Sequence, residues 1–129
     1  MLKVMIVDDE QIVRDGIRFI IEKSFQETIE IVALAKTGRE AIELFEETRP
    51  HLVLMDIQMP GINGIDAIKA IQEIHSKVKI IIISAYEQFD YAKSGFELGV
   101  VDYLLKPIHK SRLENVLEKI VQEMEEERE

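Results

Sequence analysis

Lys79-Ile80-Ile81-Ile82-Ile83 is the stretch that decides the fold of this 129-residue chain. Consecutive isoleucines favour a strand, because β-branched side chains pack well on a pleated surface. The run does not alternate with polar residues, so it fits a central strand covered on both faces better than a strand with one solvated face. It therefore predicts a parallel sheet with helices on both sides.

Four further apolar runs occur at intervals that leave room for helices. The five predicted strands cover residues 4–7, 29–34, 52–55, 80–83 and 100–105. Three of the intervening or following segments carry apolar residues at helical spacing. These are Ile12, Val13, Ile17, Ile20 and Ile21 in the first helix, Ile65, Ile68, Ile71 and Ile74 in the third, and Leu113, Val116, Leu117, Ile120, Val121 and Met124 in the last. The alternation predicts an α/β domain.

The remaining helical segments are less regular. The fourth predicted helix, residues 88–98, is broken by Ser94 and Gly95, so we expect it to be the least stable element. Ser111 followed by Glu114 predicts a capping box at the start of the last helix. Residues 123–129 contain five Glu and one Arg, and we expect them to fray as an acidic tail or the start of a linker.

Length and composition indicate one globular domain, which we place over residues 1–122. The chain has 25 acidic and 16 basic residues and a net charge of −9. This charge opposes attraction to a phosphate backbone, so we expect no direct binding of nucleic acid. The absence of cysteine excludes disulfides and thiolate metal sites. The apolar N-terminal run is too short for a signal peptide or membrane span, so we expect a soluble, cytoplasmic protein.

Acidic residues follow two of the predicted strands. Asp8 and Asp9 come after residues 4–7, with Glu10 next, and Asp56 comes after residues 52–55. The carboxyl ends of parallel strands meet at one edge of the sheet, where ligands bind. Mg²⁺ prefers oxygen ligands and usually takes one or two protein carboxylates. The acids therefore predict a magnesium site, although Asp8 and Asp9 taken alone fit helix N-capping about equally well.

Lys106 and Ser84 end two further predicted strands. A lysine at this edge could neutralise charge on a phosphoryl group, and the serine hydroxyl could hydrogen-bond there. Each has a simpler interpretation on its own, as a surface lysine beside Pro107 and as a serine that merely ends a strand. Lys106 and Ser84 indicate a phosphoryl site only in combination with the acidic residues.

Together these residues resemble the receiver domain of response regulators in two-component signalling. The matching motifs are Val-Asp-Asp-Glu at 7–10, Met-Asp-Ile-Gln-Met-Pro-Gly at 55–61, Ile-Ser-Ala-Tyr at 83–86 and Asp-Tyr-Leu-Leu-Lys-Pro at 102–107. The resemblance covers nearly the whole chain, from Lys3 to about Val121. It implies a flavodoxin-like (βα)5 fold, a doubly wound parallel sheet with strand order 2-1-3-4-5.

The resemblance also implies the roles of the site residues. Asp56 would be the phosphoacceptor, and Asp8 and Asp9 would hold Mg²⁺ together with Asp56 and the main-chain carbonyl of Gln58. Lys106 would contact the phosphoryl group. The peptide bond between Lys106 and Pro107 would be cis.

A switch and its partners follow from the same resemblance. Ser84 would bond a phosphoryl oxygen and Tyr103 would change rotamer, although Tyr103 could instead be a partly buried strand aromatic. The donor would be a sensor histidine kinase, and a homodimer could use the fourth helix, fifth strand and fifth helix. The motif at 84–92, Ser-Ala-Tyr-Glu-Gln-Phe-Asp-Tyr-Ala, is similar to receivers joined to AraC-type DNA-binding domains. It favours part of a transcriptional regulator over a stand-alone single-domain regulator.

Two other classes of protein fit these residues less well. A small Mg²⁺-dependent phosphohydrolase could use Asp56 as nucleophile, but it would need a substrate pocket and a second Asp where Gln58 stands. A flavodoxin would bring the phosphate of its flavin to an acid-lined edge, which is unfavourable. We therefore expect a signalling switch that is not an enzyme, apart from self-catalysed phosphorylation and dephosphorylation of Asp56.

Overall fold

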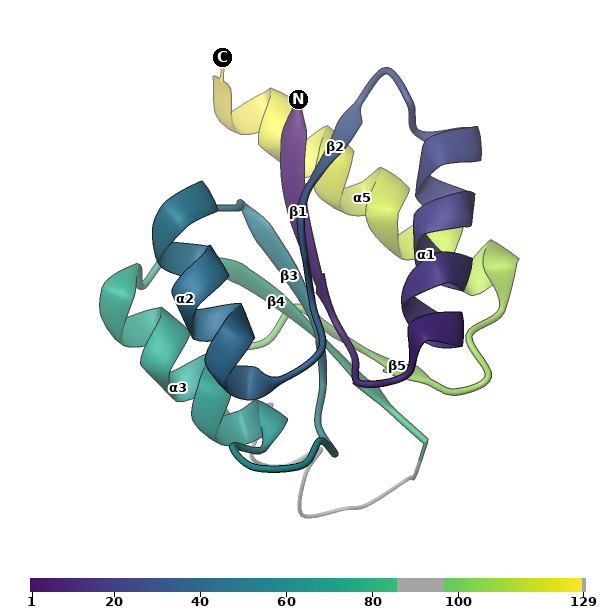
Figure 1. Cartoon of the computed structure of the whole chain (residues 1–129). Coiled ribbons are helices and arrows are strands. Elements are labelled where there is room, and N and C mark those ends of the chain that lie inside the picture. The colour runs from purple at the N-terminus through teal and green to yellow at the C-terminus, as the bar shows by residue number, and fades with distance from the viewer. Residues whose placement is uncertain (86–96, 129) are drawn as a thin grey trace.

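The computed structural model describes residues 1–85 and 97–128, and its centre is a five-stranded sheet (Figure 1). The strands are β1 (Leu2–Val7), β2 (Ile29–Ala35), β3 (Leu52–Asp56), β4 (Lys79–Ser84) and β5 (Asp102–Leu105). They lie in the order β2-β1-β3-β4-β5, and every neighbouring pair is parallel. The predicted strand order 2-1-3-4-5 is confirmed.

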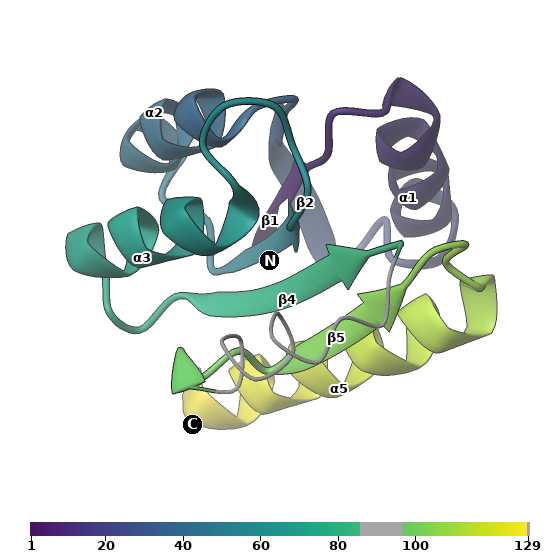
Figure 2. The same cartoon turned by 90° about the horizontal axis from the view of Figure 1, so that it is seen from below.

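Helices cover both faces of the sheet (Figure 2). The helices α2 (Gly38–Thr48) and α3 (Gly64–Ile74) pack on one face, and α1 (Gln11–Ser24) and α5 (Lys110–Arg128) pack on the other. The helix predicted over residues 88–98 and the motif at 84–92 lie largely outside the described residues. Within the part of the chain that the structure describes, none of the helices has the length and apolar character needed to cross a membrane.

The isoleucines of β4 divide between the two hydrophobic clusters of the core. Ile80 and Ile82 belong to the cluster under α2 and α3, whereas Ile81 and Ile83 belong to the cluster under α1 and α5. All four are at most 1% exposed. Burying such a side chain contributes about 1.5–3 kcal/mol. The expectation of a strand covered on both faces is therefore confirmed.

Side-chain caps fix where two helices begin. The Thr37 hydroxyl accepts a 3.0 Å hydrogen bond from the Glu40 backbone N–H at the start of α2. The Asn63 side chain accepts a 2.9 Å hydrogen bond from the Asp66 N–H at the start of α3. Such caps satisfy backbone donors that have no partner within the helix.

The predicted capping box at the start of α5 is wrong. The helix already begins at Lys110, so Ser111 lies inside it, and the His109 carbonyl accepts from the Leu113 N–H at 3.1 Å. Glu114 instead accepts a 2.7 Å hydrogen bond from the hydroxyl of Ser24 at the end of α1. Packing between α1 and α5 thus takes the carboxylate that a capping box would have used.

Two further expectations differ from the structure. Ile12 is 79% exposed, although its neighbour Val13 packs on the core. Consecutive helix positions are turned by about 100°, so a face centred on Val13 and Ile17 leaves Ile12 outside it. The expected fraying of residues 123–129 is also not seen up to Arg128, because α5 continues to that residue. Met124 packs partly on the core, and Lys79 Nζ lies 3.6 Å from Glu127 Oε1.

Candidate functional site

The carboxyl ends of β1, β3 and β5 bring two acids and a lysine into direct contact. Lys106 Nζ lies 2.9 Å from Asp8 Oδ2 and 3.6 Å from Asp56 Oδ2. Glu10 Oε1, at the mouth of the site, lies 3.2 Å from the same nitrogen. The convergence expected from the strand ends is therefore present, since residues 8, 56 and 106 come from three separate strand ends.

Both central carboxylates are buried. The side chain of Asp8 is 0% exposed and that of Asp56 is 3% exposed. Among the described residues, Asp8 Oδ2 and Asp56 Oδ2 receive no well-directed hydrogen bond. A buried charge without hydrogen bonds is costly, and the nearby Lys106 ammonium offsets only part of this cost.

The pKa values reflect this crowding. Burial, reinforced by the charge of Asp8, raises the pKa of Asp56 to about 7. Burial also raises the pKa of Asp8, although the Glu10 N–H and Lys106 act in the opposite direction. Burial alone would lower the pKa of Lys106, but its close contact with Asp8 and the charge of Asp56 outweigh burial, so the pKa of Lys106 is raised. Lys106 is therefore a cation, and a proton or a cation at the carboxylates relieves their repulsion.

The loop that carries the acidic pair is fixed by two hydrogen bonds. Asp8 Oδ1 accepts from the Glu10 N–H at 2.8 Å, and the Asp8 carbonyl accepts from Arg14 Nη1 at 2.6 Å. Arg14 was not recognised in the sequence. The available signal was its position one helical turn after Glu10, which directs a long side chain back towards the β1–α1 loop.

The loop after β3 is held between two helices. A Cβ atom at Gly64 would clash with the Asp56 carbonyl oxygen, and a Cβ at Gly38 would lie 2.7 Å from the Ile62 carbonyl oxygen. Only glycine permits these approaches, because real Cβ contacts are longer. The first residues of α2 and α3 thus support the segment that follows the phosphoacceptor candidate.

The other predicted residues border the site. Ser84 ends β4 and is 1% exposed, and Tyr103 of β5 is half-buried against the cluster under α2 and α3. The peptide bond between Lys106 and Pro107 is cis, as predicted. Gln58 is exposed two residues after Asp56, and its carbonyl stays a predicted ligand.

The residues at this site fit a hard divalent cation. Carboxylate oxygens of Asp8, Asp9 and Glu10 lie within 4.8 Å of one another. The buried Oδ2 atoms of Asp8 and Asp56, which receive no well-directed hydrogen bond from the described residues, supply further acceptors. Mg²⁺ takes carboxylate oxygens at about 2.0–2.1 Å and keeps several waters, which suits a site open on one side. Asp8, Asp9, Asp56 and the carbonyl of Gln58 are the residues that would hold it.

A family profile for the response regulator receiver domain matches residues 4–118. This chain is a receiver domain. Receiver domains are phosphorylated by histidine kinases and generally use Mg²⁺ bound by an acidic cluster.

Solved and curated relatives agree with this assignment. The receiver domain of AraT, a response regulator from Geobacillus stearothermophilus, is 38% identical and superposes with a TM-score of 0.91 over 100% of both chains. The transcriptional regulatory protein HptR of Staphylococcus aureus is 40% identical over 94% of this receiver. The transcriptional regulatory protein YesN of Bacillus subtilis is 36% identical over 96% of it. The receiver spans 47% of HptR and 33% of YesN.

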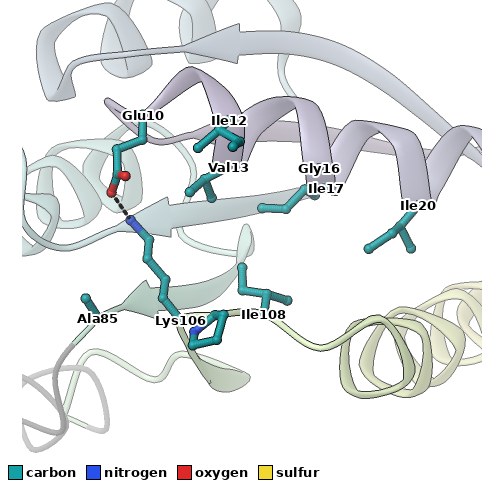
Figure 3. Close-up of a pocket in the computed structure, with 10 residues that line it drawn as sticks. Glu10, Ile12, Val13, Gly16, Ile17, Ile20, Ala85, Lys106 and Ile108 are labelled. Atoms are coloured by element: carbon teal, nitrogen blue, oxygen red, sulfur yellow. Dashed lines mark hydrogen bonds and ion pairs between the residues drawn. The ribbon is translucent and has the colours of Figure 1, made fainter.

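An apolar groove opens beside the acidic site of this receiver (Figure 3). It has a volume of about 480 Å³ and lies between α1 and the segment after β5. It is lined by the apolar residues Ile12, Val13, Gly16, Ile17, Ile20, Pro107 and Ile108, together with Glu10, Ala85 and Lys106. A protein that reaches Asp56 from this side would therefore meet an apolar surface first.

Proposed function

We propose that this receiver accepts a phosphoryl group on Asp56 from a sensor histidine kinase in a Mg²⁺-dependent reaction. The observation that carries the proposal is the position of the Asp56 carboxylate, buried beside Asp8 and 3.6 Å from Lys106 Nζ. Asp56 is thus an acceptor whose surroundings hold both a cation and potential ligands for a second one.

The reaction follows from these positions. An Asp56 oxygen attacks the phosphorus, an O–P bond forms, and the bond from phosphorus to the donor atom breaks, with its electron pair leaving on the donor. Lys106 and a bound Mg²⁺ would neutralise the charge of the phosphoryl oxygens, which is the main catalytic need in phosphoryl transfer. The protein contributes positioning and electrostatics.

The phosphoryl group stays attached to the chain, so we propose that this receiver is a switch and not an enzyme that acts on a diffusible substrate. We also propose that it works in the cytoplasm. The names of HptR and YesN support transcription as the output of the whole regulator. An AraC-type DNA-binding domain outside this chain would read the switch. A homodimer through the fourth helix, β5 and α5 would transmit it.

The apolar groove beside the site supports a protein as the natural donor. Ile12 is 79% exposed at the edge of this groove, and Lys106 borders it. A kinase that covers Ile12 and Ile108 would bring its phosphohistidine next to the acidic site. Burial of such exposed apolar side chains drives association between proteins.

Acetyl phosphate with Mg²⁺ tests the proposed function without a kinase. Intact mass should show one phosphoryl group on the wild-type chain and none on Asp56→Asn. The matched control is Asp15→Asn, which changes an exposed aspartate on α1 and should be labelled like the wild type. Labelling of Asp56→Asn would contradict the assignment. Rapid turnover of small phosphoesters would instead favour a phosphohydrolase.

A further inference from the structure

Glu10 forms an ion pair with the same lysine that contacts Asp8 and Asp56. Its Oε1 lies 3.2 Å from Lys106 Nζ, closer than Asp56 Oδ2 at 3.6 Å. Figure 3 shows this ion pair at the rim of the groove. Only 14% of the Lys106 side chain is exposed, against 57% for Glu10. The exposed carboxylate of Glu10 thus contacts the largely buried ammonium group of Lys106 from the solvent side.

We propose that Glu10 is a positioning residue that restrains Lys106 while Asp56 is unphosphorylated, and that it must release the lysine when a phosphoryl group arrives. The inference rests on the proposed function of Asp56. In this role Glu10 slows the phosphorylation of Asp56. Removal of the Glu10 charge should therefore increase the rate of phosphorylation above that of the wild type.

The backbone of Glu10 is anchored independently of this contact. Its N–H donates to Asp8 Oδ1 at 2.8 Å, and its carbonyl accepts from the Val13 and Arg14 N–H groups at 3.1 and 3.2 Å. Although Glu10 is the N-cap of α1, its side chain makes no cap hydrogen bond. The carboxylate can therefore leave Lys106 without disturbing the start of the helix.

The expected effect is modest, because Glu10 is more than half exposed. Ion pairs of this kind are weak and are screened by salt. Replacing Glu10 by the isosteric glutamine should raise the rate of Asp56 phosphorylation by about two- to fivefold at low ionic strength. The gain should shrink at about 1 M salt, where charges are screened over roughly 3 Å.

The matched control is Glu22→Gln. Glu22 lies on α1, is 59% exposed and pairs with Arg18 at 2.8 Å. The substitution therefore removes one negative charge of similar exposure, but from an ion pair that does not involve Lys106. It should leave the rate unchanged. A rate increase of equal size in Glu22→Gln would overturn the proposal, because net charge alone would then explain the gain.

A double-mutant cycle with Lys106→Met separates restraint of the lysine from local repulsion of an anionic donor. If Glu10 acts through Lys106, Glu10→Gln should have no effect on the lower rate of Lys106→Met. If it acts by repulsion, the gain should persist there, which would contradict the inference.

Mg²⁺ affinity provides the readout that is independent of phosphorylation. Because Glu10 also lies near Asp8 and Asp9, it could be a metal ligand instead. Restraint of Lys106 predicts a Kd for Mg²⁺, measured by thermal shift, within about twofold of the wild type, as expected for a weak exposed charge. A loss of tenfold or more would assign Glu10 to the metal and overturn the proposal. Failure of acetyl phosphate to label the wild-type chain would instead refute the proposed function itself.

Discussion

The backbone carbonyl of Ser84 accepts a 2.8 Å hydrogen bond from the N–H of Lys106. The two residues predicted to contact a phosphoryl group are therefore linked through the backbone of adjacent strands, where Ser84 lies opposite Leu105. A displacement of Ser84 towards Asp56 would act directly on the segment that carries Lys106.

This relationship leads to a prediction for Ser84→Ala. Beryllofluoride, a phosphoryl mimic, should change amide exchange or NMR shifts mainly between Ser84 and Leu105 in the wild type, because a hydroxyl bond to the mimic biases one of two states. These changes should be lost in Ser84→Ala and retained in Ser84→Thr, which keeps the hydroxyl. Changes centred on α1 and α2, or unaltered in Ser84→Ala, would refute this switch.

Magnesium should stabilise the folded chain. A ligand present at about 100 times its Kd that binds only the folded state adds about 2.7 kcal/mol to the free energy of unfolding. Asp9→Asn should weaken the rise in Tm and leave the metal-free protein as stable or more so, because one of the repelling charges is gone. Differential scanning calorimetry with and without Mg²⁺ measures both effects. An unchanged Mg²⁺ response in Asp9→Asn, compared with the exposed control Asp66→Asn, would place the metal elsewhere.

The stability of the metal-free protein should fall as the pH rises. Burial and Asp8 raise the pKa of Asp56 from 3.8 to about 7, so the folded state binds its proton more tightly than the unfolded state does. The stabilisation from this proton is complete below about pH 4 and is lost as the pH rises to about 7, with a slope of at most about 1.4 kcal/mol per pH unit.

Urea unfolding in the presence of a chelator measures this pH dependence. The control is Asp56→Asn, which cannot titrate and should show a flatter profile between about pH 5 and pH 7. A wild-type protein whose stability increases over this interval, relative to Asp56→Asn, would contradict the raised pKa.

The apolar groove predicts a difference between donors. Ile12→Ser should slow phosphoryl transfer from a sensor kinase that labels the wild type, yet leave labelling by acetyl phosphate unchanged. Because Ile12 is 79% exposed, the substitution should alter stability by no more than about 0.5 kcal/mol. Phe19→Ser is the matched control, since Phe19 is 64% exposed on the same helix but does not line the groove. Equal slowing by both variants would argue against docking at the groove.

The sheet could be predicted because its central strands β1, β3 and β4 are apolar runs too short for helices, separated by segments with helical spacing. Asp8, Asp56 and Lys106 could be placed together for a related reason, since parallel strands end at one edge. The capping box at Ser111 failed because Ser24, far away in sequence, binds Glu114. A local sequence pattern cannot show that a residue distant in sequence will bind the same side chain.

The supporting contacts of the site were also hidden in the sequence. Arg14 donates to a carbonyl, and every residue has a carbonyl, so the partner depends on the path of the loop. The role of Gly64 depends on the lack of space for a Cβ atom beside the Asp56 carbonyl, and a glycine at the start of a helix does not indicate this in the sequence. Glu10 was visible as a neighbour of the acidic pair, but its contact with Lys106 joins residues 96 positions apart.

The close approach of Gly64 to Asp56 has a directional consequence. On the side of α2 and α3, backbone meets backbone at Gly64 and Gly38, so this wall of the site has no space into which it could yield. On the opposite side, Lys106 and Ala85 border an open groove. We therefore expect a new group on Asp56 to displace β4 and β5 more than the side of the site that α2 and α3 form.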